Sequence, residues 1–152
     1  MPYECLKTEA TKLGVNTYEL PLKNKGLYSD NVIWINNSLI TTERTCVLAE
    51  ELGHYHTTSG DILDQSRLNN RKQERRAREW AHNRLIPFQR IIDAHEARVK
   101  GRHEIAEFLG VTEEFLQESI NRYMDKYGIF IQINDRFTIM LEPLSVIELL
   151  PS

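Results

Sequence analysis

The stretch Val47-Leu-Ala-Glu-Glu-Leu-Gly-His-Tyr55 decides what this chain is built around, because it places two acids in an otherwise apolar helical segment. At about 100° per residue, Glu51 falls between Val47 and Tyr55, inside the apolar stripe of the predicted helix. Carboxylates are seldom placed on such a face without a partner, and a metal ion is one such partner. Glu50 and His54 are four residues apart, so both side chains can hold one ion from a single helix.

A second predicted helix repeats this anomaly. We expect it to begin after Asn70, which can act as its N-cap while Gln73 reaches back in a variant of the capping box, and to end near Pro87. Glu74 shares one face of this helix with small and apolar residues, namely Ala77, Ala81 and Leu85. The two alanines favour close packing against the first helix, and Gly53 favours it from the other side. Two helices that each present an acid inward, with His54 available, predict a metal site.

The remaining pattern predicts a mainly helical α+β fold. We expect short strands at residues 18–21 and 31–36, and helices at residues 2–13, 41–57, 88–100, 103–109 and 113–127. Thr41 or Thr42 can cap the second of these helices, residues 58–61 are expected to break it, and Thr112 can cap the last helix. Lys25-Gly26 and Ser29-Asp30 predict turns before the strand at 31–36. Residues 129–133 and 137–141 predict a β-hairpin. A length of 152 residues favours a single domain over 1–152, with a core at about 15–100 and accessory helices and a hairpin at about 101–152.

Composition indicates an ordinary globular protein. Apolar residues make up 41% of the chain, yet no stretch approaches the roughly 18 apolar residues that a membrane span needs. The first residues lack the apolar segment of an export signal, so we expect a cytoplasmic protein with no membrane partner. Cys5 and Cys46 are too few for a disulfide framework and too far apart for a Cys-x-x-Cys site, so both are expected to be reduced.

Charge is distributed unevenly along the chain. Residues 61–104 carry 11 basic and 7 acidic groups, and residues 105–152 carry 3 and 8. A basic segment can contact nucleic acid, although a charge run is more often a solvated helix face. Candidates for such contacts are Arg67, Arg71, Lys72, Arg75, Arg76 and Arg78, on a helix that needs its other face for Glu74.

Residues 105–120 resemble a helix-turn-helix, which raises a DNA-binding accessory as one alternative. The would-be recognition helix carries Glu113, Glu114 and Glu118, whose charges would face phosphates with the wrong sign. We therefore expect no direct contact with nucleic acid. The segment is interpreted as a helical hairpin that packs on the core or receives a protein substrate.

Taken together, the two motifs resemble the ImmA/IrrE family of metallopeptidases, in particular the small members encoded by prophages and integrative elements. The first motif resembles a His-Glu-x-x-His helix in which Glu50 stands at the first histidine position. Glu74-x-x-Ala-x-x-Trp80-Ala, followed by Leu85-Ile-Pro87, is similar to the family's Glu-x-x-Ala-x-x-Phe-Ala…Leu-Met-Pro signature. The resemblance implies a zincin-like peptidase domain with a small β-sheet.

The resemblance further implies a cytoplasmic endopeptidase that cleaves a phage or mobile-element repressor and so derepresses gene expression. By position, His54 and Glu74 are metal ligands and Glu51 is the catalytic acid/base. Helix geometry makes Glu50 the candidate third ligand. Two carboxylates and one imidazole form a harder ligand set than two imidazoles and one carboxylate. One divalent ion is therefore expected, with zinc favoured and manganese or iron as alternatives.

The glutamate at position 50 leaves a second hypothesis for the function. A protein that retains the peptidase fold with weak or no catalysis could bind the repressor as an anti-repressor. Both readings predict the same protein partner, a repressor, and neither predicts an oligomeric state. The histidines outside the two motifs are expected to be ordinary surface or core residues, namely His56, His82, His95 and His103.

Overall fold

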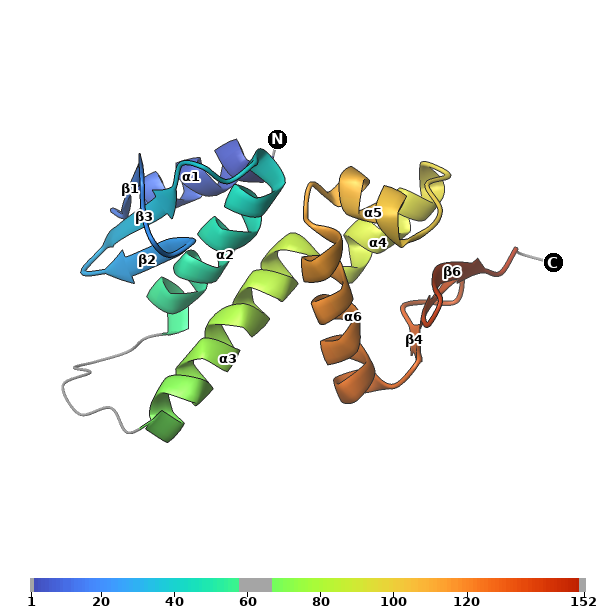
Figure 1. Cartoon of the computed structure of the whole chain (residues 1–152). Helices are drawn as coiled ribbons and strands as arrows, with labels where there is room; N and C mark the ends of the chain where they lie inside the picture. Colours follow the sequence, from blue (N-terminus) through green and yellow to red (C-terminus); the bar gives the residue numbers. More distant parts are fainter. Residues whose placement is uncertain (1, 58–66, 151–152) are drawn as a thin grey trace. The chain divides into compact units, whose positions relative to one another are not determined.

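The computed structural model describes residues 2–57 and 67–150, and it divides the chain into two compact units, Met1–Leu85 and Ile86–Ser152. The predicted mainly helical α+β class, with small sheets, is confirmed (Figure 1). The single domain with a core at about 15–100 stays a prediction. In the described ranges, no helix is both long and apolar enough to cross a membrane. The helix break predicted at 58–61 lies outside the described residues.

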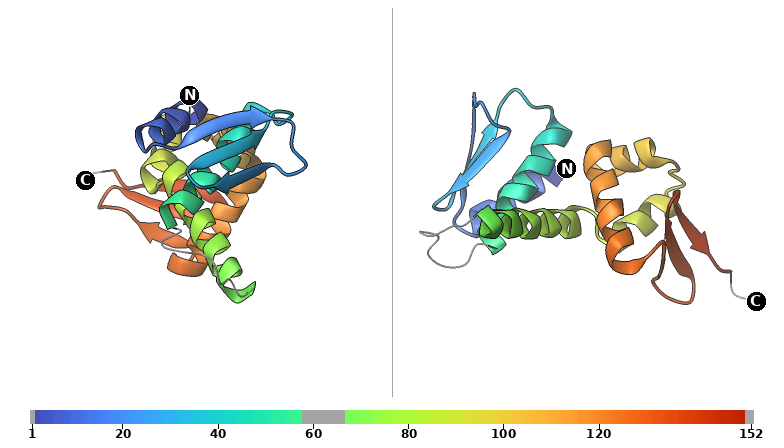
Figure 2. Two further views of the ribbon diagram at one scale, coloured as in Figure 1. Left: turned by 90° about the vertical axis from the view of Figure 1, so that its left-hand side faces the viewer. Right: turned by 60° about the horizontal axis from the view of Figure 1, so that its bottom comes forward.

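The N-terminal unit combines helices with one three-stranded sheet. Its elements are α1 (Pro2–Lys12), β1 (Asn16–Leu20), β2 (Gly26–Ser29), β3 (Val32–Asn36), α2 (Thr41–Thr57) and α3 (Arg67–Leu85). The strand order is β1-β3-β2, with β1 parallel and β2 antiparallel to β3. Figure 1 and the right-hand view of Figure 2 show α2 between this sheet and α3. The strand β2 is therefore an edge strand that runs beside α2.

Small residues let α2 and α3 approach each other closely. A Cβ atom added to Gly53 would overlap the carbonyl oxygen of Ala77 and lie 2.9 Å from its Cα. Ala77 and Ala81 are fully buried, which confirms the predicted packing role of these three residues. On its other side, α2 buries Leu48 and Leu52 in the core of this unit. Backbone contact between the two helices thus fixes where the side chains of neighbouring positions meet.

Two predicted helix caps were wrong. The helix α3 begins at Arg67, so Asn70 lies inside it and cannot be its N-cap. The helix α2 begins at Thr41, which places Ile40 at the capping position. There the carboxylate of Glu43 reaches back and accepts a hydrogen bond from the Ile40 amide at 3.4 Å. This hydrogen bond is the returning half of a capping box, in which a side chain at the third helical position accepts from the amide of the capping residue.

The strand β2 was not predicted, because its ends were interpreted only as turns. Asp30 and Asn31 do form a tight turn, with φ angles of 48° and 63°. Two successive residues with positive φ are typical of the two-residue turn that joins antiparallel strands. The residues before this turn, Gly26–Ser29, pair with β3. The predicted strand at 31–36 is confirmed as β3, and the one at 18–21 overlaps β1.

The C-terminal unit contains α4 (Phe88–Glu96), α5 (Arg102–Leu109), α6 (Glu113–Tyr127), β4 (Phe130–Gln132), β5 (Phe137–Leu141) and β6 (Leu144–Glu148). The predicted cap of α6 is confirmed, since the Thr112 hydroxyl accepts a hydrogen bond from the Phe115 amide at 3.1 Å. The predicted hairpin is also confirmed, but β6 extends it to a three-stranded antiparallel sheet. The helix α4 ends at Glu96, earlier than predicted, because Arg98 turns the chain with a φ of 61°.

Candidate functional site

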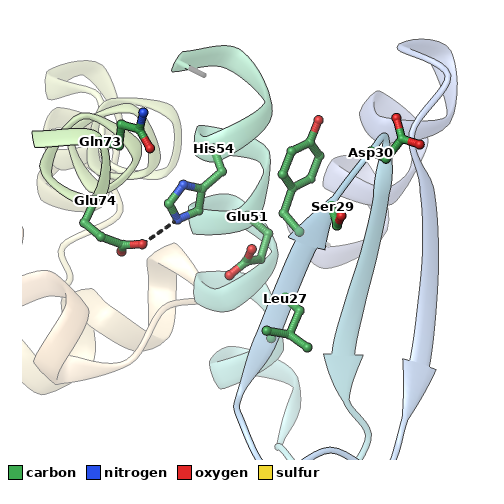
Figure 3. A pocket seen from close by; sticks show the side chains of 9 residues that line it. Leu27, Ser29, Asp30, Glu51, His54, Gln73 and Glu74 are labelled. Atoms are coloured by element: carbon green, nitrogen blue, oxygen red, sulfur yellow. Dashed lines mark ion pairs between the residues drawn. The ribbon is translucent and has the colours of Figure 1, made fainter. Parts of the chain in front are cut away.

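A pocket of about 420 Å³ lies where α2, α3 and β2 meet. The helix α2 contributes Glu51 and His54, α3 contributes Gln73 and Glu74, and the strand and its turn contribute residues 26–30. Figure 3 shows His54 and Glu74 pointing toward each other, with Glu51 beside β2. Three of the four predicted site residues therefore share one pocket. The edge strand forms the opposite wall.

The ion pair between His54 and Glu74 joins the two helices. The His54 Nε2 atom lies 3.1 Å from the Glu74 Oε1 atom. Two ligands of a tetrahedral zinc ion, at about 2.0–2.2 Å from the metal, lie about 3.3–3.6 Å apart. The observed 3.1 Å is slightly shorter than this, and the donor types, an imidazole and a carboxylate, suit two neighbouring ligands of one divalent ion. The same spacing also suits a direct ion pair.

Glu51 is held between α2 and the sheet. A Cβ atom added to Gly26 of β2 would overlap the Val47 side chain and lie 3.5 Å from Cγ of Glu51. The absence of a side chain at position 26 thus leaves room for the Val47 side chain, and the strand backbone lies close to Glu51. Burial, followed by the nearby charges of Glu50 and Glu74, raises the pKa of the Glu51 carboxyl from 4.5 to about 7. A carboxyl that exchanges a proton near neutral pH suits general acid–base work.

Glu50 is not among the residues that line the pocket. It is half-buried on α2 and close enough to raise the pKa of Glu51. Across residues 2–57 and 67–150, no three His, Cys, Asp or Glu side chains lie together as a metal-binding group. The structure thus brings together two of the three predicted ligands, and the role of Glu50 stays a prediction.

The expectation that Glu74 faces inward was wrong in part. Its side chain is 55% exposed, whereas that of His54 is 20% exposed. Glu74 is exposed because the buried face of α3 begins only at Ala77, about one turn later. Ala77 is the residue at which α3 touches α2. Glu74 therefore lies at the rim of the pocket, with one oxygen directed at His54 and solvent beside it.

The histidines outside the two motifs lie away from the pocket, as expected. His56 stacks on Trp80 with ring centroids 4.4 Å apart, and burial lowers its pKa. His82 is buried in the core. The other two pair with glutamates of the C-terminal unit, His95 with Glu148 and His103 with Glu107 and Glu113.

Sequence reasoning missed the residues that line the rest of the pocket. Tyr28 and Ser29 come from the strand β2, whose ends were predicted only as turns, and Asp30 comes from the turn that follows it. Gln73 was interpreted as a capping residue, but it lines the pocket next to Glu74. Alternating burial along Gly26–Ser29 is a strand signature, although four residues are too few for the sequence pattern to reveal it.

The comparisons with known proteins agree with this geometry. The family model of the IrrE N-terminal-like domain, a peptidase M78 domain, matches residues 10–121. This range spans more than half of the chain and includes every residue of the pocket. A search of curated proteins returns no match.

Proposed function

Because the chain belongs to the IrrE N-terminal-like family of metallopeptidases, we propose that it is a metal-dependent endopeptidase that cleaves a phage or mobile-element repressor. Cleavage would remove the repressor and switch on the genes that it silences. The observation that carries this proposal is the shared pocket of Glu51, His54 and Glu74. A half-buried carboxyl beside an imidazole–carboxylate pair is the group of side chains that such hydrolysis uses.

An extended segment of the substrate would bind along β2. This strand pairs with β3 on one side and, among the described strands, has no neighbour on the other. Its residues line the pocket together with Glu51. A free strand edge offers backbone donors and acceptors to an extended peptide, and this pairing holds the peptide straight across a site. Leu27, which is 43% exposed and lines the pocket, offers an apolar contact for a substrate side chain.

His54 and Glu74 would hold one divalent cation, with Glu50 as the third ligand. Such a cation supplies Lewis acidity, which polarises a peptide carbonyl and makes water a stronger acid. A site with two carboxylates suits zinc and also manganese or ferrous iron. The contact between α2 and α3 at Gly53 supports this assignment, because it holds the two helices at a fixed separation beside the pocket.

Glu51 would move the proton. With a pKa raised to about 7, its carboxyl is partly ionised at neutral pH and can accept a proton from the attacking water. The protonated carboxyl can then donate to the leaving amine, which needs a proton to depart. Glu51 is half-buried and lines the pocket, so its carboxyl is available to a substrate bound there.

A second candidate function is capture of the repressor without cleavage. It is favoured by Glu50, which stands where the related peptidases have a histidine, and by the two-ligand arrangement of the described side chains. Both functions use the same pocket and strand edge. They differ only in whether the bound segment is cut.

The test is incubation of the protein with the repressor encoded beside its gene, with zinc and in parallel with manganese. We expect a discrete fragment by mass spectrometry, strongly reduced for Glu51→Gln and unchanged for Glu114→Gln, an exposed acid of the C-terminal unit. A repressor that stays intact with zinc and also with manganese would overturn the peptidase function and leave capture. A fragment formed equally by Glu51→Gln would refute the role of Glu51.

A further inference from the structure

The helix α3 carries a dense row of exposed basic side chains beside the pocket. Within nine residues, at positions 71–79, five are basic and exposed, namely Arg71, Lys72, Arg75, Arg76 and Arg78. Among the described residues, none of these five has an acidic partner within 4 Å. The row therefore differs from two other arginines of the N-terminal unit, Arg44 and Arg84. Arg44 pairs with Glu19, and Arg84 with Glu9.

Like charges recur along this row at helical spacing. Arg71 and Arg75 are four residues apart, as are Lys72 and Arg76, and Arg75 and Arg78 are three apart. Like charges at these spacings lie on neighbouring turns and destabilise a helix. Glu74 and Glu79 lie at similar spacings, but among the described residues no ion pair joins either acid to the row. The row is therefore available to a partner outside the chain.

The row also flanks the pocket. With Glu74 at 0°, the helical period places Arg78 at about 40°, Arg71 at about 60° and Arg75 at about 100°. Glu74 lies one turn from both Arg71 and Arg78, yet its ion-pair partner is His54 across the pocket. A chain segment that leaves the pocket over Glu74 would meet these three arginines next.

We propose that Arg71, Arg75 and Arg78 bind an acidic segment of the substrate, a few residues from the peptide bond placed in the pocket. Arginine suits this task, because its planar guanidinium donates two parallel hydrogen bonds to one carboxylate. This inference rests on the proposed function, since it assumes that a polypeptide enters the pocket. It adds a specificity rule, namely acidic residues on one side of the cleaved bond.

An acidic peptide fits this surface better than a nucleic acid does. The pocket beside the arginines contains three carboxylates, Glu51, Glu74 and Asp30. A nucleic acid carries a charge at every phosphate and would bring those charges close to the carboxylates. A peptide can place an uncharged segment at the pocket and its carboxylates over the arginines. The acids within α3, Glu74 and Glu79, also disfavour a nucleic acid, because they would repel its phosphates.

The test measures peptide binding to the full chain. A metal chelator is present, so that no peptide is cleaved. Two fluorescein-labelled peptides are titrated and followed by anisotropy, one with glutamates next to an apolar segment and one with glutamines in their place. We expect tighter binding of the acidic peptide and a loss of that preference as salt is raised. The triple variant Arg71→Gln/Arg75→Gln/Arg78→Gln should bind the acidic peptide about tenfold more weakly.

A matched control removes the same charge elsewhere. Lys12→Gln/Arg98→Gln/Lys126→Gln replaces three exposed cations outside the pocket and α3, and it should bind as the wild type does. Thermal unfolding separates interaction from structure, because exposed cations that form no ion pair with a described acid contribute little to stability, so the arginine variant should stay about as stable as the wild type. Equal binding of the two peptides, or equal affinity of the arginine variant, would overturn the proposal.

A labelled DNA duplex forms the third arm. Duplex binding tighter than that of the acidic peptide, abolished by the same three substitutions, would also overturn the proposal and assign the surface to nucleic acid. Because no arm requires catalysis, failure here leaves repressor cleavage standing. Selective binding of the acidic peptide by a protein that cleaves no repressor would instead support the surface and refute the proposed function alone.

Discussion

His54 of α2 lies 3.1 Å from Glu74 of α3. His54 directly follows Gly53, the residue at which the backbones of the two helices touch. The ion pair and the backbone contact are therefore parts of one arrangement. Gly53 permits the approach, Ala77 receives it, and the functional side chains meet beside it. A change in the helix contact should accordingly alter the site as well as the stability.

Gly53→Ala tests this coupling. The added methyl would overlap the Ala77 carbonyl, so the helices must separate. We expect a loss of about 1–3 kcal/mol in the free energy of unfolding from this overpacking, measured by urea denaturation. Helix propensity alone predicts a gain of about 1 kcal/mol, so the sign of the change decides between the two effects.

Gly14→Ala provides the comparison. An added Cβ there meets no atom within 4 Å, but the φ of +81° strains any side chain. This variant should lose about 1 kcal/mol and leave metal binding unchanged. A Gly53→Ala protein as stable as the wild type would show that the helix contact does not limit the site.

The pH dependence of stability tests the environment of Glu51. Its folded-state pKa is about 7, above the ordinary value of 4.5, so the folded state holds its proton over a range in which the unfolded state releases it. In metal-free protein this carboxyl therefore lowers stability as the pH rises from 4.5 to 7, and the cost is constant above that range. Below pH 4.5 both states are protonated and the cost vanishes.

Glu51→Gln removes this ionisation. In chelator, the variant should match the wild type near pH 4.5 and exceed it above pH 7 by up to about 3 kcal/mol. Urea denaturation across this pH range measures the difference. A stability difference that does not depend on pH would mean that the carboxyl is not desolvated as described.

The cap of α6 offers a test in the C-terminal unit. Thr112→Ala removes the acceptor for the Phe115 amide and should cost about 1 kcal/mol in stability. Thr112→Ser keeps the hydroxyl and should lose much less. Thermal unfolding of both variants checks the difference, and equal losses would attribute the effect to the Thr112 methyl group instead of the cap.

The sequence predicts best where a single periodic pattern determines the structure. The helices around Glu51 and Glu74 follow from apolar spacing, and their contact follows from Gly53, Ala77 and Ala81, because small residues on two facing stripes allow close packing. The cap at Thr112 follows from local chemistry alone. The IrrE-like family also follows, because its two motifs lie on these helices.

The features that the sequence did not predict depend on tertiary contacts. The strand β2 is short and gains its stability from β3 and α2, so its own residues, Gly26–Ser29, carry little signal. Glu74 was expected to face the core, because the helical period shows on which side of α3 a residue lies. The period does not show at which residue the contact between α3 and α2 ends. For the same reason the period places Glu50 beside His54, yet Glu50 is not among the residues that line the pocket.

Metal content tests the central claim most directly. The protein is purified without added metal, dialysed against zinc and then against metal-free buffer, and its bound metal is measured by elemental analysis. Our account predicts one ion per chain in the wild type, and almost none in His54→Ala, Glu74→Ala or Glu50→Ala, with full retention in Glu114→Ala. A wild type without bound metal, or equal metal content in all of these variants, would contradict it.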